Sequence, residues 1–293
     1  MLEDGLLKYV VFMDIISVCV KNNLVKNVIH PLISKLKEYS SQFGISYEEQ
    51  LALFTACKSA VVGEKLENDV ISIERIMLES ILKVGSPESI NMASEMIIRS
   101  VNLPGFFGFE DFINLSAIQA LKQGDAKHTF VYSLLNTFVS GNYLTWKDFV
   151  ATNKSSLEEA NVDLESAELK IQMLSLASLG NRELGNKIPF SKVSEEMFGT
   201  SSLENELDIE LIIIDTIRFG LINAKIDQID HSITISRSTV RQFGMDEWKI
   251  IGKRFNEWRT SLNALLPVIN NAKLIAQLSL SSAPAVVEIT KKK

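Results

Sequence analysis

Cysteine, proline and histidine are scarce in this chain of 293 residues, which contains 2, 6 and 3 of them. Cys19 and Cys57 lie inside apolar helical patterns, without a metal-ligating partner at short spacing. We therefore expect neither a disulfide framework nor a zinc site, and a reducing compartment fits this composition. The sequence predicts a cytoplasmic protein that holds no metal and no cofactor.

A surplus of basic residues is also missing. Thirty Lys and Arg stand against 36 Asp and Glu, which gives a net charge of -6 and a pI near 5.3. Because phosphate contacts supply most of the affinity for nucleic acids, a protein that mainly binds them usually carries the opposite balance. The composition disfavours that role and leaves room for a local basic patch only.

No apolar run is long enough to cross a membrane. The most apolar segment near the start, Leu6–Val20, is short for a span and carries Lys8 and Asp14. We expect it to be a buried helix rather than a signal peptide. With 46% hydrophobic and 23% charged residues, the chain is globular, mostly ordered and large enough for a sizeable core.

The motifs of common catalytic sites are absent from the sequence. It contains no HExxH, GxSxG or P-loop pattern, and His30, His128 and His231 lie in three separate segments. The glycine-rich loop at residues 105–108 lacks the lysine of a phosphate-binding loop. A catalytic site needs a constellation of groups that this sequence does not offer, so we do not expect an enzyme.

Residues 1–163 have the pattern of one helix after another. Ser46 and Glu49 form a capping box, Ser86 precedes a helix-starting proline, and we expect Ser155 and Glu158 to cap a further helix. The predicted helices are Leu6–Val20, Leu24–Tyr39 with a kink at Pro31, Tyr47–Val62, one after Ser86, Glu110–Leu121, Lys127–Val139 and Thr145–Val150. Their lengths suit a solenoid of stacked antiparallel helix pairs.

Residues 164–244 follow the order of a winged helix. We expect three helices: Ser166–Leu179, Ser191–Phe198, and one from a Ser201/Glu204 capping box to Phe219. The three expected strands are an edge strand at Asn186–Phe190, Leu221–Asp227, and an alternating strand through Ile233, Ile235 and Arg237. Gly220 is the expected helix cap, and residues 230–232 form the turn. The fold class is therefore mainly α: a helical solenoid, a winged-helix module and a long C-terminal helix.

The third helix of this module would enter a DNA groove in a winged helix that reads DNA. Such a helix presents Arg, Lys, Asn or Gln to the bases. Here it carries acidic residues against the single Arg218, and its apolar residues are expected to be buried all round; they are Ile209, Leu211, Ile212, Ile213, Ile214 and Ile217. The module should bind protein rather than specific DNA. Lys225, Arg237 and Arg241 are candidate RNA contacts, although a solvated charged edge is the simpler interpretation.

The last helix, over residues 245–280, has apolar residues spaced alternately three and four apart, as in a heptad seam. We expect Trp248 through Phe255 to pack within the protein. The later part of the seam would face helices of other subunits, and its members are Trp258, Leu262, Leu265 and Ile269. Pro267 predicts a kink or a restart. Residues 281–293 have the composition of a flexible tail.

Several segments resemble the PCI-domain family, which the proteasome lid, the COP9 signalosome and translation initiation factor 3 share. The wing segment KIDQIDHSITISRSTVRQFG (Lys225–Gly244) and WKIIGKRFNEWRTSLNALL (Trp248–Leu266) are most similar to the M-subunit family of eukaryotic initiation factor 3. LKIQMLSLASLG (Leu169–Gly180), FEDFINLSAIQAL (Phe109–Leu121) and HTFVYSLLNTFVSGNY (His128–Tyr143) resemble the preceding helices of that family.

The resemblance covers roughly residues 106–266 and is weak before them. It implies a non-catalytic scaffold subunit that supports assembly of the preinitiation complex on the small ribosomal subunit and mRNA recruitment. Its partners would be neighbouring PCI subunits, which it would meet through winged-helix edges and a bundle of C-terminal helices. The alternative is a COP9 signalosome scaffold similar to its subunit 7. A third class, a free-standing winged helix that binds nucleic acid, would require salt-sensitive binding by the module.

Overall fold

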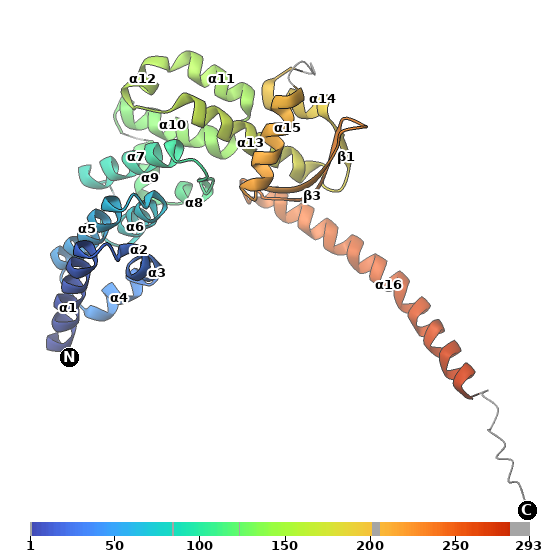
Figure 1. Cartoon of the computed structure of the whole chain (residues 1–293), viewed down its shortest axis with the longest axis horizontal. Coiled ribbons are helices and arrows are strands. Elements are labelled where there is room, and N and C mark those ends of the chain that lie inside the picture. The colour runs from blue at the N-terminus through green and yellow to red at the C-terminus, as the bar shows by residue number, and fades with distance from the viewer. Residues whose placement is uncertain (1, 84, 123, 201–205, 282–293) are drawn as a thin grey trace, which may run out of the picture. The chain divides into compact units, whose positions relative to one another are not determined.

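The computed structural model describes residues 2–83, 85–122, 124–200 and 206–281. The chain forms two compact units, Met1–Gln242 and Phe243–Lys293. In the first unit, an array of helices leads into a small sheet packed against helices (Figure 1). The described part of the second unit is one long helix. The predicted mainly α fold is confirmed, and none of the described helices combines the length and apolarity that a membrane span requires.

The array consists of twelve helices among the described residues. They are α1 (Leu2–Lys21), α2 (Val25–Val28), α3 (His30–Ile33), α4 (Leu36–Phe43), α5 (Tyr47–Gly63), α6 (Glu67–Ser80), α7 (Pro87–Asn102), α8 (Glu110–Ile113), α9 (Ser116–Leu121), α10 (Ala126–Ser140), α11 (Tyr143–Thr152) and α12 (Lys154–Glu159). Helices close in sequence pack against each other: α5 on α6, α6 on α7, and α7 on α9 and α10. One continuous apolar core runs through the array.

The cap signatures start two helices where the sequence predicts them. At α5 the Ser46 amide donates to the Glu49 carboxylate at 2.8 Å, and the Glu49 amide donates to Ser46 Oγ at 3.4 Å. At α7 the Ser89 amide donates to Ser86 Oγ at 3.2 Å, with Pro87 in the first turn. The prediction missed α6, whose N-cap residue Leu66 makes no side-chain cap and leaves no such signature.

Three helix predictions in the array are wrong in detail. The segment expected as one helix over residues 24–39 is broken into α2, α3 and the start of α4, because Pro31 has no amide proton and opens α3. The segment over residues 110–121 is split into α8 and α9. Ser155 and Glu158 cap nothing, since both already lie inside α12.

The N-terminal helix α1 is not the buried helix that its apolar composition predicts. Ile16 and Cys19 are buried, but Leu7, Val11 and Val18 are 62%, 48% and 55% exposed. Among the described residues, α1 packs against α2, α4 and α5 on one side only, as the first helix of the array. Apolar residues around a whole helix predict burial only when neighbours surround it.

The rest of the first unit is a winged helix. Its elements are α13 (Leu164–Arg182), β1 (Lys187–Pro189), α14 (Phe190–Phe198), α15 (Glu206–Arg218), β2 (Ile222–Asp227) and β3 (Ser232–Ser238). The three strands pair antiparallel in the order β1-β3-β2, which confirms the edge strand predicted around Pro189. The predicted Ser201/Glu204 capping box lies outside the described residues.

Helix α13 joins the array to the winged helix. Ala167, Ile171 and Leu174 belong to the core of the array, while Leu176 and Leu179 belong to the core beneath the sheet. A helix with two buried faces connects its neighbours firmly. The predicted boundary at residue 164 coincides with the start of this shared helix, so residues 164–182 serve both halves.

Two positive-φ residues shape the chain ahead of and within the wing. Gly220 adopts φ 75° after α15, where its amide donates to the Ile217 carbonyl at 2.9 Å and the Leu221 amide to the Thr216 carbonyl at 3.1 Å. His231 adopts φ 43° in the turn between β2 and β3. Both features fall where the sequence predicts the helix cap and the turn.

The second unit contains α16 (Met245–Ser281), a single helix with Pro267 inside it. Of the predicted kink or restart at Pro267, the restart is therefore wrong, and the kink stays a prediction. Proline removes the helical donor to the Asn263 carbonyl, and on a solvated helix that carbonyl can accept from water instead. Most of the segment predicted as a tail, residues 282–293, lies outside the described residues.

Candidate protein-interaction surfaces

The free edge of the sheet is the first candidate surface. Among the described residues, strand β2 pairs with β3 on one side only, so its other edge carries backbone groups that no strand pairs. Ile222 is buried, while Asn223 and Lys225 point outward and are exposed. Such an edge is a natural template for pairing with a strand of another subunit. Strand β1 is less suited to this role, because it is three residues long and ends in Pro189.

Helix α15 is less buried than the sequence predicts. Ile209, Ile212 and Ile213 are in the core, as expected. Leu211 and Ile214 are instead 59% and 50% exposed, because the described elements that α15 packs against, α13, α14 and β2, cover one side of it. The exposed side carries Asp208 and Asp215, so it has the wrong charge for a DNA groove.

Two of the three predicted RNA contacts lie together on the outward face of the sheet. Lys225 on β2 and Arg237 on β3 are both exposed, and the register Asn223↔Arg237 and Lys225↔Thr234 places them on the same face. Nothing in their surroundings distinguishes an RNA contact from a solvated charged edge. An RNA contact by Lys225 or Arg237 remains a proposal.

Arg241 occupies a different place. Its guanidinium donates to the Gly141 carbonyl at 2.7 Å, the Phe138 carbonyl at 2.5 Å and the Thr137 carbonyl at 3.4 Å. Burial lowers the pKa of this guanidinium to about 10, opposed by the charge of Glu196. The side chain ties the end of the winged helix to the C-terminal turn of α10. We therefore do not carry Arg241 further as an RNA contact.

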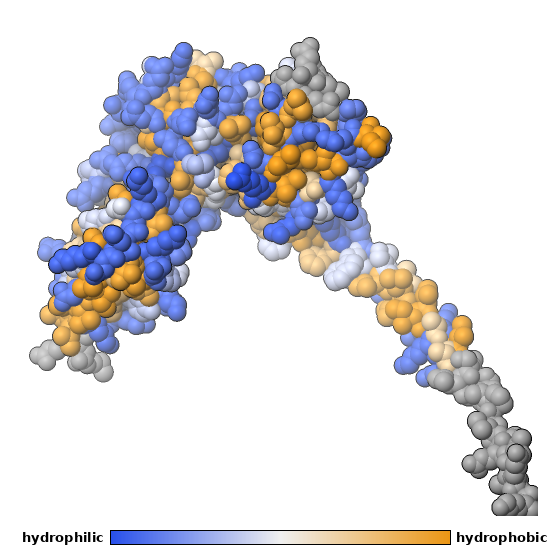
Figure 2. All heavy atoms as spheres, in the orientation of Figure 1, coloured by the Kyte–Doolittle hydropathy of each residue, from blue (hydrophilic) through white to orange (hydrophobic). Residues whose placement is uncertain are grey.

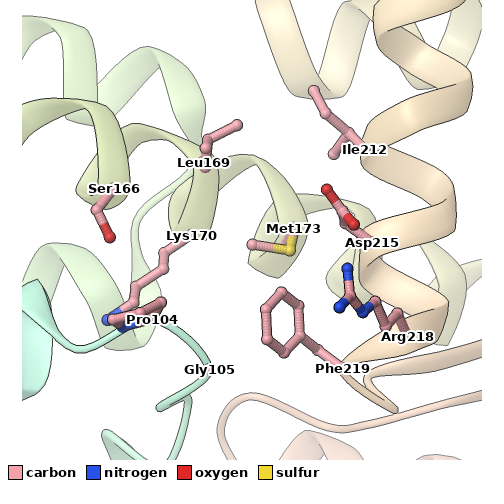
Figure 3. A pocket seen from close by; sticks show the side chains of 10 residues that line it. All are labelled: Pro104, Gly105, Ser166, Leu169, Lys170, Met173, Ile212, Asp215, Arg218 and Phe219. Atoms are coloured by element: carbon pink, nitrogen blue, oxygen red, sulfur yellow. The ribbon is translucent and has the colours of Figure 1, made fainter.

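Lys170, which no sequence motif marks, is a deeply buried cation beside a cavity. Lys170 of α13 is 1% exposed and donates to the Ser100 and Val101 carbonyls at 2.7 and 2.6 Å, at the end of α7. Burial lowers the pKa of its ammonium to about 7, opposed by Asp163. The adjoining cavity, of about 240 Å³, lies between α13 and α15 (Figure 3).

The seam of α16 is the third candidate surface. Trp258, Leu262, Leu265 and Ile269 are 62%, 45%, 53% and 61% exposed. The described part of this unit is a single helix, and a single helix cannot bury its own side chains. The Trp248 ring packs edge-on against the Phe243 ring of the same unit, at 5.1 Å between centroids. The proposed division of the seam into an inner and an outer half therefore stays a prediction.

The histidines are scattered, as their sequence positions indicate. His30 pairs with Asp69 at 2.7 Å within the helical array, and His231 lies in the wing turn. Among the described residues, no group of three or more His, Cys, Asp or Glu side chains is placed to hold a metal ion.

Comparison with known proteins shows which proteins the chain is similar to. No family model matches the chain. Proteins named eukaryotic translation initiation factor 3 subunit M are similar to it: that of Phaeosphaeria nodorum is 25% identical over 84% of the chain and 54% of its own length. That of Schizosaccharomyces pombe is 25% identical over 82% and 56%. That of Dictyostelium discoideum is 27% identical over 67% and 47%.

The chain is similar to proteins named eukaryotic translation initiation factor 3 subunit M. It spans about half the length of the curated relatives it matches. The similarity to the first two relatives extends over 248 and 239 residues, well beyond the 161 residues of the resemblance noted from motifs alone. The similarity to subunit M therefore covers more of the chain than the wing and the last helix.

Proposed function

We propose that this chain is a non-catalytic scaffold subunit of the translation initiation factor 3 complex in the cytoplasm. In that role it supports assembly of the preinitiation complex on the small ribosomal subunit and mRNA recruitment. The observation that carries the proposal is the similarity to subunit M over 82–84% of the chain in two distant fungi. Proteins from three organisms carry the same name, which favours initiation factor 3 over the COP9 signalosome.

The proposed mechanism is geometric rather than chemical. Strand β2 offers an open edge to the sheet of a neighbouring winged helix. Helix α16 offers a heptad seam over residues 248–269, which a bundle of helices from other subunits would cover. The array and the winged helix share α13, so the surfaces they carry stay in fixed relation to each other within the first unit.

Affinity purification of the tagged full chain with quantitative mass spectrometry tests this proposal. Initiation factor 3 subunits should be recovered in near-stoichiometric amounts, together with small-subunit ribosomal proteins. A washing step at raised salt should remove the ribosomal proteins first, because contacts to RNA are more salt-sensitive than apolar helix packing. Recovery of signalosome subunits instead, or of no stable partner, would refute it.

A further inference from the structure

Helix α15 exposes a straight apolar stripe along the side that faces away from its core. Leu207, Leu211 and Ile214 follow each other at spacings of four and three, and they are 76%, 59% and 50% exposed. Figure 2 shows apolar side chains gathered over this helix. Leu169 of α13, 48% exposed, and Phe219, 43% exposed, flank the cavity at its C-terminal end. We call these five residues the α15 stripe.

Two members of the stripe, Leu169 and Phe219, also line the cavity beside Lys170. Leu169, Met173, Ile212 and Phe219 give the cavity apolar walls (Figure 3). Gly105, at φ +86°, lies so close to the Phe219 ring that a Cβ there would meet Phe219 Cε1 at 3.1 Å. Because Lys170 already donates to two backbone carbonyls, it does not supply a free charge for a ligand. The cavity thus offers apolar walls to one large side chain, together with polar groups from Ser166, Asp215 and Arg218.

Acidic groups surround the stripe. Asp208 and Asp215 are exposed on α15, and Glu165 lies one helical turn before Leu169 on α13. The Glu210 carboxylate accepts from the Gln228 side-chain amide at 3.1 Å. Arg218 is the only cation of α15 itself. An apolar ridge with acidic flanks attracts a ligand that is apolar at its centre and basic at its sides.

We propose that the α15 stripe is a docking site for an amphipathic α-helix of a partner protein with Lys or Arg flanking its apolar face. One large side chain of that helix enters the cavity between α13 and α15. Residues 207–219 extend over about 18 Å, at about 1.5 Å per residue, which matches about three turns of a docked helix. The face that a DNA-reading winged helix turns to the groove thus serves protein recognition. This site is separate from the β2 edge and from α16, and it does not depend on which complex the chain joins.

The test uses the full chain and two synthetic helices of about 18 residues. Both carry leucine at positions i, i+4 and i+7 and phenylalanine at i+11. One has lysine on the flanks of the apolar face and the other has glutamate. Fluorescence anisotropy at low salt should show tighter binding of the lysine helix. Leu211→Glu should weaken that binding by about tenfold or more, since central apolar anchors dominate such contacts. Asp215→Lys should reverse the preference between the two helices.

Leu7→Glu on α1 is the matched control, because Leu7 is 62% exposed and Leu211 is 59% exposed. This variant should bind the lysine helix as the unchanged chain does. Equal binding of both helices, no effect of Leu211→Glu, or an equal loss with Leu7→Glu would overturn the proposal. Sedimentation of the chain alone adds a further check: a dimer that Leu211→Glu abolishes would assign the stripe to a second copy instead. If Leu211→Glu lowers the melting temperature, its loss of binding no longer tests the site. The reversal of the preference between the two helices by Asp215→Lys then decides whether the stripe binds them.

Discussion

At the scale of single residues, Lys170 links the helical array to the winged helix. Its ammonium is held by two carbonyls at the end of α7, while burial lowers its pKa from 10.5 to about 7. Lys170→Met keeps most of the volume and removes the donor. We expect the free energy of unfolding to fall by about 1–3 kcal/mol at pH 9, because two buried carbonyls lose their partner. Urea denaturation of both proteins measures this.

The difference in stability between the unchanged chain and Lys170→Met should depend on pH. The folded pKa lies below the unfolded one, so between pH 7 and 10.5 the unfolded chain binds more protons than the folded chain. Stability from this group therefore rises with pH across that window and is constant below it. The stability advantage of the unchanged chain over Lys170→Met should grow from pH 7 to pH 10. A difference that is flat across these pH values would show that Lys170 keeps an ordinary pKa.

Arg241 gives the second prediction at this scale. Arg241→Ala should lower the free energy of unfolding by about 2–3 kcal/mol, because three carbonyls at the end of α10 lose a charged donor. Arg237→Ala is the control, since Arg237 is exposed on the sheet and should change stability by less than about 0.5 kcal/mol. Chemical denaturation of the two variants should separate them. Equal losses would contradict the assigned role of Arg241.

These two residues also show where sequence reasoning ends. Lys225, Arg237 and Arg241 look alike in the sequence, and only the fold shows that Arg241 meets carbonyls about 100 residues earlier in the chain. Lys170 lies in a stretch of apolar residues with no pattern that marks its partners 70 residues away. Contacts that depend on how distant helix ends meet cannot be read from local periodicity.

At the scale of elements, the wing should depend on the inward face of β3. Ile233 and Ile235 are fully buried beneath the sheet. Ile233→Asp or Ile235→Asp should lower the free energy of unfolding by more than about 3 kcal/mol, because a carboxylate would be buried without a partner. Ile229→Asp is the matched control, since Ile229 lies at the wing turn and is 90% exposed. Thermal melts that are unchanged in all three variants would show that β3 does not face the core.

Local signals predicted elements well where they act through the backbone. The Ser46 capping box, the proline after Ser86 and Gly220 each fix a helix boundary by a hydrogen bond or a φ angle. Burial was predicted less well: α1 and α15 carry apolar residues on both sides, and only the arrangement of their neighbours decides which side is covered. Which half of each helix is exposed could therefore not be predicted from the sequence.

At the scale of the whole molecule, the chain presents exposed apolar and strand-edge surfaces on a well-packed first unit. The first unit has two cores joined by α13, which gives the β2 edge and the α15 stripe a common frame. The second unit carries the apolar seam of α16. The division into residues 1–163, 164–244 and 245–280 remains a proposal. Helix α13 contributes residues to both cores of the first unit, so the boundary at residue 164 does not separate them.

The central claim is that α16 joins this chain to other subunits, and one comparison tests it most directly. Trp258→Ala combined with Leu262→Ala should remove two anchors of the seam, each worth about 2 kcal/mol or more if buried by a partner. Leu144→Ala serves as a control on an exposed leucine of α11. Co-precipitation by the tagged chains is quantified alongside thermal melts of the purified proteins. We expect the double variant to melt like the unchanged chain but to recover far less of the initiation factor 3 subunits. Normal recovery, or unfolding of the variant, would contradict it.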